Sequence, residues 1–190
     1  MQTSDFHFIN SQDFFADSIA LAEQVKKFGT KFDYLIAINR GGAVLGRYLS
    51  DLLTVPMGAF AMASYVGVNL RKELKITQEL NLDLKDKNIL IVDEICDSGT
   101  TFIKALDYVN LFSPAQIQTA ALVVKPHASY KPDFWVQEID KWVVFPYEMI
   151  ETFKATKDQS EEVKTMIKDF FVKGGAELSV VESLYQKALP

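Results

Sequence analysis

The amino-acid sequence predicts an α/β fold, a single domain in which a mostly parallel sheet is flanked by helices and followed by a helical C-terminal tail. Short apolar runs that suit buried strands, at residues 34–39, 89–93 and 117–125, alternate with longer stretches of helical spacing. Successive parallel strands need a crossover connection, which is usually a helix, so this alternation indicates a parallel sheet with right-handed crossovers. The 190 residues are 48% hydrophobic and 24% charged, an ordinary globular composition.

The first half of the chain is predicted to begin with an amphipathic helix over 11–28. Asn10 or Ser11 can cap its start, and Gly29 ends it. The next elements are expected in this order: a strand at 34–39, a helix at 43–53 and a strand at 57–64. Residues 66–82 are polar and charged around an uncertain core, and we expect them to form a mobile excursion.

The second half of the chain is predicted to continue the alternation and then to become helical. The expected elements are a strand at 89–93, a helix at 101–112, a strand at 117–125 and two short strands, or one bent strand, at 135–139 and 142–145. Ser160 can cap a helix that runs to Lys173, and a last helix spans 176–188. We therefore expect the α/β domain to occupy residues 1–155 and a helical extension to occupy 156–190.

Composition and charge exclude several classes of function. Asp and Glu outnumber Lys and Arg by 25 to 20, and a chain of net charge −5 is a poor candidate for non-specific nucleic-acid binding. The single cysteine, Cys96, rules out an intrachain disulfide and a multi-cysteine zinc site. The first residues do not resemble a secretion signal, and no run approaches about 18 apolar residues. We expect a cytoplasmic protein with neither a nucleic acid nor a membrane as partner.

The segment that carries chemistry is residues 89–101, with the sequence ILIVDEICDSGTT. An apolar strand ends there in two adjacent carboxylates, Asp93 and Glu94, and a third carboxylate, Asp97, follows three residues later. Residues 98–101 then open a helix. Ligands of open α/β sheets bind at the carboxyl ends of strands, and a helix N-terminus after a glycine-containing turn is an anion site.

These features together suit a ribose 5-phosphate group. Carboxylates only accept hydrogen bonds, so Asp93 and Glu94 can bind the two hydroxyls of a ribose diol. The backbone N–H groups and hydroxyls of residues 98–101 can bind the phosphate. The alternative is an acidic turn followed by an ordinary Ser/Thr helix cap. Two other phosphate motifs are missing, because the sequence has no GxxxxGK[ST] and Ala43 breaks the GxGxxG pattern in GGAVLG.

Residues 93–101, with the sequence DEICDSGTT, resemble the phosphoribosyl-diphosphate (PRPP) signature of type I phosphoribosyltransferases. The resemblance covers roughly residues 30–150 and implies the fold of that family, with a small hood over the base. Further segments resemble other parts of the family. Asn39 to Gly42 resemble the pyrophosphate loop, and Ser64 and Tyr65 with Arg71 resemble the flexible lid. Lys125-Pro126 resemble the end of a strand where purine-using members carry a base-contacting lysine, and WVVFPYE at 142–148 resembles the hood.

The resemblance implies a set of contacts with PRPP. Asp93 and Glu94 would hold the ribose hydroxyls, with Mg²⁺ nearby and Glu94 reaching the metal mainly through PRPP. Arg71 would close over the substrate, unless it belongs to a surface charge run. The remaining groups would bind the two ends of PRPP. The pyrophosphate would be bound by Arg40, Gly41 and Gly42, in a loop where relatives have a non-proline cis peptide bond. The 5′-phosphate would be bound by Ser98, Gly99, Thr100 and Thr101. A plain strand-to-helix turn is the alternative for residues 40–42.

The resemblance also implies how the base is held. Asp97 would face the purine N7 as a general acid–base, unless it is only the cap of the following helix. Lys125 would bind the 6-oxo group, and the alternative is a lysine that extends to solvent from a sheet edge. Trp142 would stack on the base, unless it belongs to the core, and the backbone around Val143 would contact the purine edge. The proline in this hood favours the xanthine-guanine type over the hypoxanthine-guanine type.

The implied function is purine salvage, in which an oxopurine (guanine, xanthine or hypoxanthine) and PRPP give a nucleoside monophosphate and pyrophosphate. The alternatives are a PRPP-binding regulatory protein without transferase activity and a transferase for a different base. Lys125 and the tryptophan argue against orotate, uracil and adenine. Related enzymes form dimers or tetramers, so we expect a homodimer or homotetramer. No role is assigned to the remaining polar candidates, which are His7, Cys96, His127 and Glu148.

Overall fold

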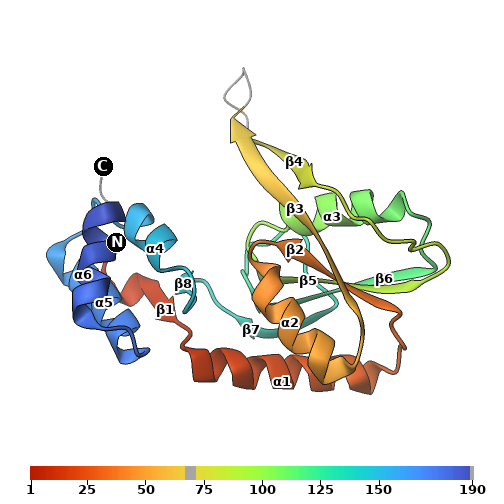
Figure 1. The fold of residues 1–190 in the computed structure, drawn as a ribbon, viewed down its shortest axis with the longest axis horizontal. Coiled ribbons are helices and arrows are strands. Elements are labelled where there is room, and N and C mark those ends of the chain that lie inside the picture. Colours follow the sequence, from red (N-terminus) through yellow and green to blue (C-terminus); the bar gives the residue numbers. More distant parts are fainter. Residues whose placement is uncertain (67–71, 189–190) are drawn as a thin grey trace. The chain divides into compact units, whose positions relative to one another are not determined.

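A six-stranded sheet organises residues 16–138 in the computed structural model (Figure 1). The structure describes residues 1–66 and 72–188. The chain divides into two compact units, one made of Ala16–Glu138 and the other of Met1–Phe15 together with Ile139–Pro190. This division differs from the expected limits at 155 and 156, which remain a prediction. No helix among the described residues is long and apolar enough to span a bilayer.

The sheet has the strand order β4-β3-β2-β5-β6-β7, so β2 and β5 are the central pair. Every neighbouring pair is parallel except β3 and β4, which are antiparallel. The strands have these bounds: β2 Tyr34–Asn39, β3 Met57–Val66, β4 Lys72–Gln78, β5 Asn88–Cys96, β6 Gln116–Val124 and β7 Phe134–Glu138. The α/β class and the mostly parallel sheet are therefore confirmed.

The excursion expected at 66–82 is wrong for residues 72–78, which form the edge strand β4 beside β3. Its side chains alternate, since Leu74 and Ile76 are half-buried while Lys75 between them is exposed. An antiparallel edge strand with one solvated face has this polar composition, which explains why the segment looks unlike the core strands.

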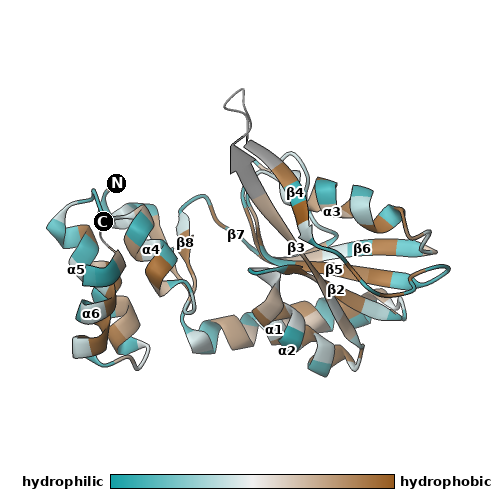
Figure 2. Cartoon of the chain, turned by 45° about the horizontal axis from the view of Figure 1, so that its top comes forward, coloured by the Kyte–Doolittle hydropathy of each residue, from teal (hydrophilic) through white to brown (hydrophobic). Residues whose placement is uncertain are grey.

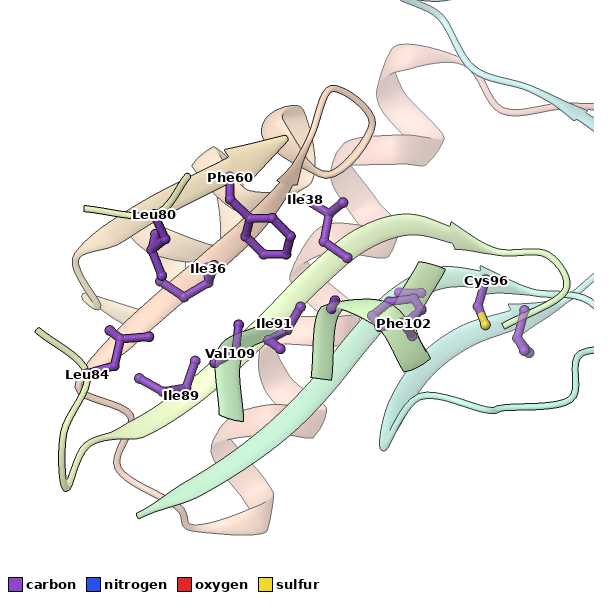
Figure 3. Close-up of a cluster of buried hydrophobic side chains, with 13 residues drawn as sticks. Ile36, Ile38, Phe60, Leu80, Leu84, Ile89, Ile91, Cys96, Phe102 and Val109 are labelled. Atoms are coloured by element: carbon purple, nitrogen blue, oxygen red, sulfur yellow. The ribbon is translucent and has the colours of Figure 1, made fainter. Parts of the chain in front are cut away.

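Helices cover both faces of the sheet. Along β2 the side chains alternate between faces: Ile36 and Ile38 join the core cluster that includes residues of α3 (Thr100–Asn110), whereas Ala37 lies against Gly46 of α2 (Gly42–Leu53). Figure 3 shows the α3 side of this core, with Cys96 and Phe102 toward one end. The predicted helices are confirmed, and each observed end lies within two residues of the predicted one.

The helix α1 (Ser11–Phe28) has the predicted bounds and cap. The side-chain oxygen of Asn10 accepts hydrogen bonds from the backbone N–H groups of Gln12 and Asp13, at 2.8 and 2.9 Å. These bonds satisfy two donors that the first turn of a helix otherwise leaves open. The side chains of Leu21 and Val25 are buried, whereas Phe15 and Ile19, which share the apolar spacing of the helix, are exposed.

The second unit joins both ends of the chain. β1 (Phe6–Phe8) pairs in parallel with β8 (Trp142–Val144), so β7 and β8 are separate strands in different sheets and not one bent strand. The helices α4 (Met149–Ala155), α5 (Glu161–Lys173) and α6 (Leu178–Ala188) follow. Ser160 caps α5 by accepting a hydrogen bond from the N–H of Val163 at 3.4 Å, as predicted.

A separate hydrophobic core holds the second unit together. Its buried residues come from β1, β8 and the three C-terminal helices, and they include Phe6, Val144, Phe153, Ile167 and Val181. Figure 2 shows brown, apolar segments on α5 and α6 beside teal, polar ones, as expected for amphipathic helices. The helical C-terminal tail is thus part of a unit with its own buried interior.

Candidate active site

Two loops leave the same edge of the sheet. β2 and β5 are parallel neighbours, so the loops that follow their carboxyl ends start side by side. The peptide bond between Asn39 and Arg40 is cis, as the family resemblance implies, and α2 begins at Gly42. The sheet topology therefore brings the predicted pyrophosphate loop next to the acidic end of β5.

Gly41 and Gly42 lie against that acidic end. A Cβ atom at Gly41 would overlap the Glu94 carboxylate, and a Cβ atom at Gly42 would overlap the carbonyl oxygen of Val92. The N–H of Gly42 donates a hydrogen bond to the Asp93 carboxylate. At Gly42 glycine is needed because the loop backbone approaches the backbone of β5 too closely for any side chain, whereas at Gly41 the neighbour is the Glu94 side chain, which can move.

The adjacent carboxylates Asp93 and Glu94 are buried, at 9% and 6% exposure. Burial, followed by the negative charge of Glu94, raises the pKa of Asp93 well above its ordinary value. The backbone N–H of Glu94 donates a hydrogen bond to Asp93 Oδ1 at 3.1 Å. Such a pair is stabilised by hydroxyl donors or by a cation, because either one offsets the cost of holding two negative charges together.

The acidic pair does not form a complete metal site by itself. Within residues 1–66 and 72–188, no group of three or more His, Cys, Asp or Glu side chains is arranged to hold a metal ion. Carboxylate oxygens are nevertheless ligands that Mg²⁺ prefers, and Mg²⁺ commonly takes its other ligands from water and substrate phosphates. Asp93 and Glu94 fit that partial donor set.

The predicted phosphate loop opens α3. Gly99 precedes the first helical residue with φ of +88°, a conformation that favours glycine, and a Cβ atom there would lie 2.6 Å from the backbone nitrogen of Tyr130. The hydroxyls of Ser98 and Thr100 share a hydrogen bond of 2.9 Å, and the N–H of Thr100 donates to Ser98 Oγ at 3.3 Å. The loop thus presents hydroxyls and a helix N-terminus together.

Asp97 is not the cap of α3, because Gly99 occupies that position. The alternative reading of Asp97 as only a helix cap is therefore wrong. Its carboxylate is 69% exposed, and its Oδ1 atom lies 3.2 Å from Nε2 of His127, whose side chain is 60% exposed. The structure therefore gives Asp97 a partner that the sequence analysis does not predict.

The segment between β6 and β7 contacts the phosphate loop along its length. In this β6–β7 segment (residues 125–130), the N–H of Lys125 donates to the carbonyl of Cys96 at 2.9 Å. Ser129 donates its N–H and its hydroxyl to the carbonyl of Ser98, at 2.9 and 2.8 Å. From the sequence only Lys125 of this segment is assigned a role, because nothing local in the sequence shows which loops meet.

Tyr130 anchors the far end of the β6–β7 segment. Its hydroxyl shares a hydrogen bond of 2.8 Å with Thr119 Oγ1, and its ring stacks on Phe102 of α3 with centroids 5.9 Å apart. Its carbonyl accepts a hydrogen bond from the thiol of Cys96 at 3.1 Å. The phosphate loop and this segment are therefore fixed to each other and to the core.

Cys96 and Lys125 are both buried, and they differ in what they can do. Burial, followed by the charges of Asp93 and Asp97, raises the pKa of the Cys96 thiol from 9.0 to about 11. The thiol is thus a poor nucleophile. Lys125 is only 7% exposed at the end of β6, so it does not extend into solvent as the alternative for this residue requires.

The remaining predicted residues are Arg40, in the pyrophosphate loop, and residues of other segments. Arg40 is exposed in its loop. Trp142 and Val143 belong to the second unit, where Trp142 is 41% exposed and Val143 pairs with His7 across the β1–β8 ladder. Trp142 is thus not a core residue. Arg71 lies outside the described residues, and so do the side chains of Ser64 and Tyr65.

Comparison with protein families gives a match over most of the chain. The family described as the phosphoribosyl transferase domain matches residues 9–161. Hypoxanthine phosphoribosyltransferase of Haemophilus influenzae is 30% identical over 128 residues, which are 62% of this chain and 70% of that protein. The match with human hypoxanthine-guanine phosphoribosyltransferase is 35% identical over 126 residues, so the chain spans about half (54%) of that relative's length.

Solved structures agree with the family match. A purine phosphoribosyltransferase from Pyrococcus horikoshii is similar with a TM-score of 0.70 and 31% identity, over 75% of this chain and 93% of that one. A xanthine-guanine-hypoxanthine phosphoribosyltransferase from Helicobacter pylori is similar with a TM-score of 0.67 and 28% identity, over 79% of this chain and 99% of that one.

Proposed function

The chain belongs to the phosphoribosyl transferase domain family, and we propose that it transfers the phosphoribosyl group of PRPP to an oxopurine base, giving a nucleoside monophosphate and pyrophosphate. The observation that carries this proposal is the meeting of two loops at the ends of β2 and β5. There the glycines of one loop lie against the buried carboxylates of the other, beside a helix N-terminus. These loops offer binding groups for a pyrophosphate, a ribose diol and a phosphate, the three parts of PRPP.

The PRPP would lie across these two loops. Asp93 and Glu94 would accept hydrogen bonds from the ribose hydroxyls, which would also relieve the cost of their adjacent charges. The 5′-phosphate would bind the loop at 98–101 and the N-terminus of α3. The pyrophosphate would bind the backbone of residues 41–42 and the Arg40 guanidinium, with Arg71 closing over it.

Magnesium fits the acidic pair as a partner of bound PRPP. Glu94 and Asp93 would hold it together with substrate oxygens, because the described residues supply only a partial set of ligands. The ion would supply positive charge that stabilises the departing pyrophosphate.

Three residues are proposed to bind the base. Lys125 would donate a hydrogen bond to the 6-oxo group, which selects oxopurines over adenine, since adenine has a donor at that position. Trp142 would stack on the base, which is worth about 1–3 kcal/mol for comparable contacts, and the backbone at Val143 would contact the purine edge. Xanthine and guanine are the favoured bases of this hood, with hypoxanthine as a further substrate.

The chemical step needs orientation and one proton transfer. The purine N9 attacks C1′ of the ribose as the bond from C1′ to the pyrophosphate oxygen breaks, and the electron pair leaves with pyrophosphate. Asp97 takes the proton from N7, which restores the neutral base in the product. The protein otherwise positions the reactants and excludes water, which would hydrolyse PRPP.

The test is to mix the protein with PRPP and Mg²⁺ and, in separate reactions, guanine, xanthine, hypoxanthine and adenine. Release of pyrophosphate with an oxopurine, and formation of the matching monophosphate, is the expected result. PRPP binding without turnover of any base would instead identify a regulatory PRPP-binding protein. Turnover of adenine alone would refute the proposed role of Lys125. Light scattering of the same sample tests the expected homodimer or homotetramer.

A further inference from the structure

We propose that His127 is a positioning residue that holds the Asp97 carboxylate in the orientation needed to take the N7 proton. This inference rests on the proposed transfer reaction. Its starting observation is the distance of 3.2 Å between His127 Nε2 and Asp97 Oδ1. The two residues are 30 positions apart in the sequence, and they meet because β5 and β6 are parallel neighbours whose following loops leave one edge.

Backbone hydrogen bonds fix the two loops on both sides of this pair. Before it, the N–H of Lys125 donates to the carbonyl of Cys96 at 2.9 Å. After it, Ser129 donates twice to the carbonyl of Ser98. Cys96 and Ser98 are the immediate neighbours of Asp97, and Lys125 and Ser129 each lie two residues from His127. The backbones that carry both side chains are therefore held in register with each other.

The geometry points to a hydrogen bond from the imidazole to the carboxylate. An Nε2–H group of the imidazole would donate to Oδ1 of Asp97. That bond occupies one carboxylate oxygen and fixes the plane of the group, which leaves Oδ2 to accept a proton from a bound base. Without it, an exposed aspartate samples several rotamers, and misorientation of a reacting group can cost up to about 100-fold in rate.

The contact between His127 and Asp97 is expected to matter for catalysis and not for the stability of the fold, because both side chains are exposed. The side chains are 60% and 69% exposed, and ion pairs between exposed side chains contribute little to stability. We therefore expect loss of the imidazole to lower turnover while leaving unfolding by urea unchanged.

The experiment measures kcat and KM for PRPP and for guanine in the full chain and three single variants. His127→Ala is expected to lower kcat by roughly tenfold, with both KM values changed less than about twofold. His127→Gln is expected to recover most of the activity, because its amide also carries an N–H donor. Lys131→Gln is the control, since the ammonium group of this nearby residue bonds Glu138 at 2.6 Å.

A double variant tests whether His127 acts through Asp97. In the Asp97→Asn background, His127→Ala should change kcat by less than about twofold, because its partner is already disabled. A full additional loss would overturn the inference, and so would unchanged kcat in His127→Ala or an effect on KM alone. If the unmodified chain turns over no base, the proposed function fails first, whereas an active chain that tolerates His127→Ala refutes only the role of His127.

Discussion

Replacing Gly99 by alanine tests the close approach of the phosphate loop to the β6–β7 segment. Gly99 has φ of +88°, and an L-residue in the left-handed region costs about 1–2 kcal/mol. The new Cβ atom would also lie 2.6 Å from the backbone nitrogen and 2.8 Å from the Cβ atom of Tyr130. Tyr130 cannot move freely because its hydroxyl is bonded to Thr119, so overpacking adds roughly 1–3 kcal/mol.

Gly29 provides a matched control in the same unit. It also has φ of +88°, but nothing lies within 4 Å of a Cβ atom built there. Gly29→Ala should therefore lower the free energy of unfolding only by the cost of the left-handed conformation, about 1–2 kcal/mol. Gly99→Ala should lower it by about 2–5 kcal/mol, because overpacking is added to that cost. Urea unfolding followed by far-ultraviolet circular dichroism measures both free energies of unfolding.

The same pair of variants separates structure from binding. Displacement of Tyr130 would pull the β6–β7 segment away from the loop at 98–101, so Gly99→Ala should also raise KM for PRPP, whereas Gly29→Ala should not. Equal destabilisation by the two substitutions would refute the close approach. An unchanged KM for PRPP in Gly99→Ala would refute the proposed place of the 5′-phosphate.

Three further predictions concern individual side chains. Asp97→Asn should lower kcat by roughly 10²- to 10⁴-fold without moving the urea midpoint, because the carboxylate is exposed, and an unchanged rate would contradict its acid–base role. Lys125→Gln should raise KM for guanine by about 10- to 100-fold, as expected for loss of a charged hydrogen bond, and an equal rise in KM for PRPP would count against a base contact. Iodoacetamide should alkylate native Cys96 slowly at a pH near 9.0, the ordinary pKa of a thiol, and faster only as the pH approaches about 11. The reason is that the raised pKa keeps the thiol protonated below about pH 11. Rapid alkylation at a pH near 9.0 would show that burial and the acidic neighbours do not control the reactivity of this thiol.

Contiguous signals in the sequence predicted most of the fold. The run at 34–39 is bounded by polar residues and glycines, and β2 has those limits in the structure. The acidic pair and the Ser-Gly-Thr-Thr turn lie within nine residues, so their order along one strand end could be predicted without knowing any tertiary contact. β4 also carried a readable signal, the alternation of Leu74 and Ile76 with polar residues, which the high charge of the segment obscured.

Contacts between distant segments could not be predicted in the same way. The three residues of β1 are too few to show a period, and their strand exists only because β8 pairs with them. Likewise His127 has no local motif, and its proximity to Asp97 depends on β6 lying next to β5. The choice of Gly99 as the helix cap depends on the space left by Tyr130. The roles assigned to the site residues remain predictions until the variants are measured.

The central position of β2 and β5 has a consequence for hydrogen exchange. Each of these strands is bonded to a neighbour on both sides, and an amide in such a strand exchanges with solvent only through a large opening of the sheet. The loops at 40–42 and 97–99 are therefore attached to the part of the unit that we expect to exchange most slowly. We therefore expect either loop to open locally while the strands β2 and β5, from which the loops begin, stay hydrogen-bonded.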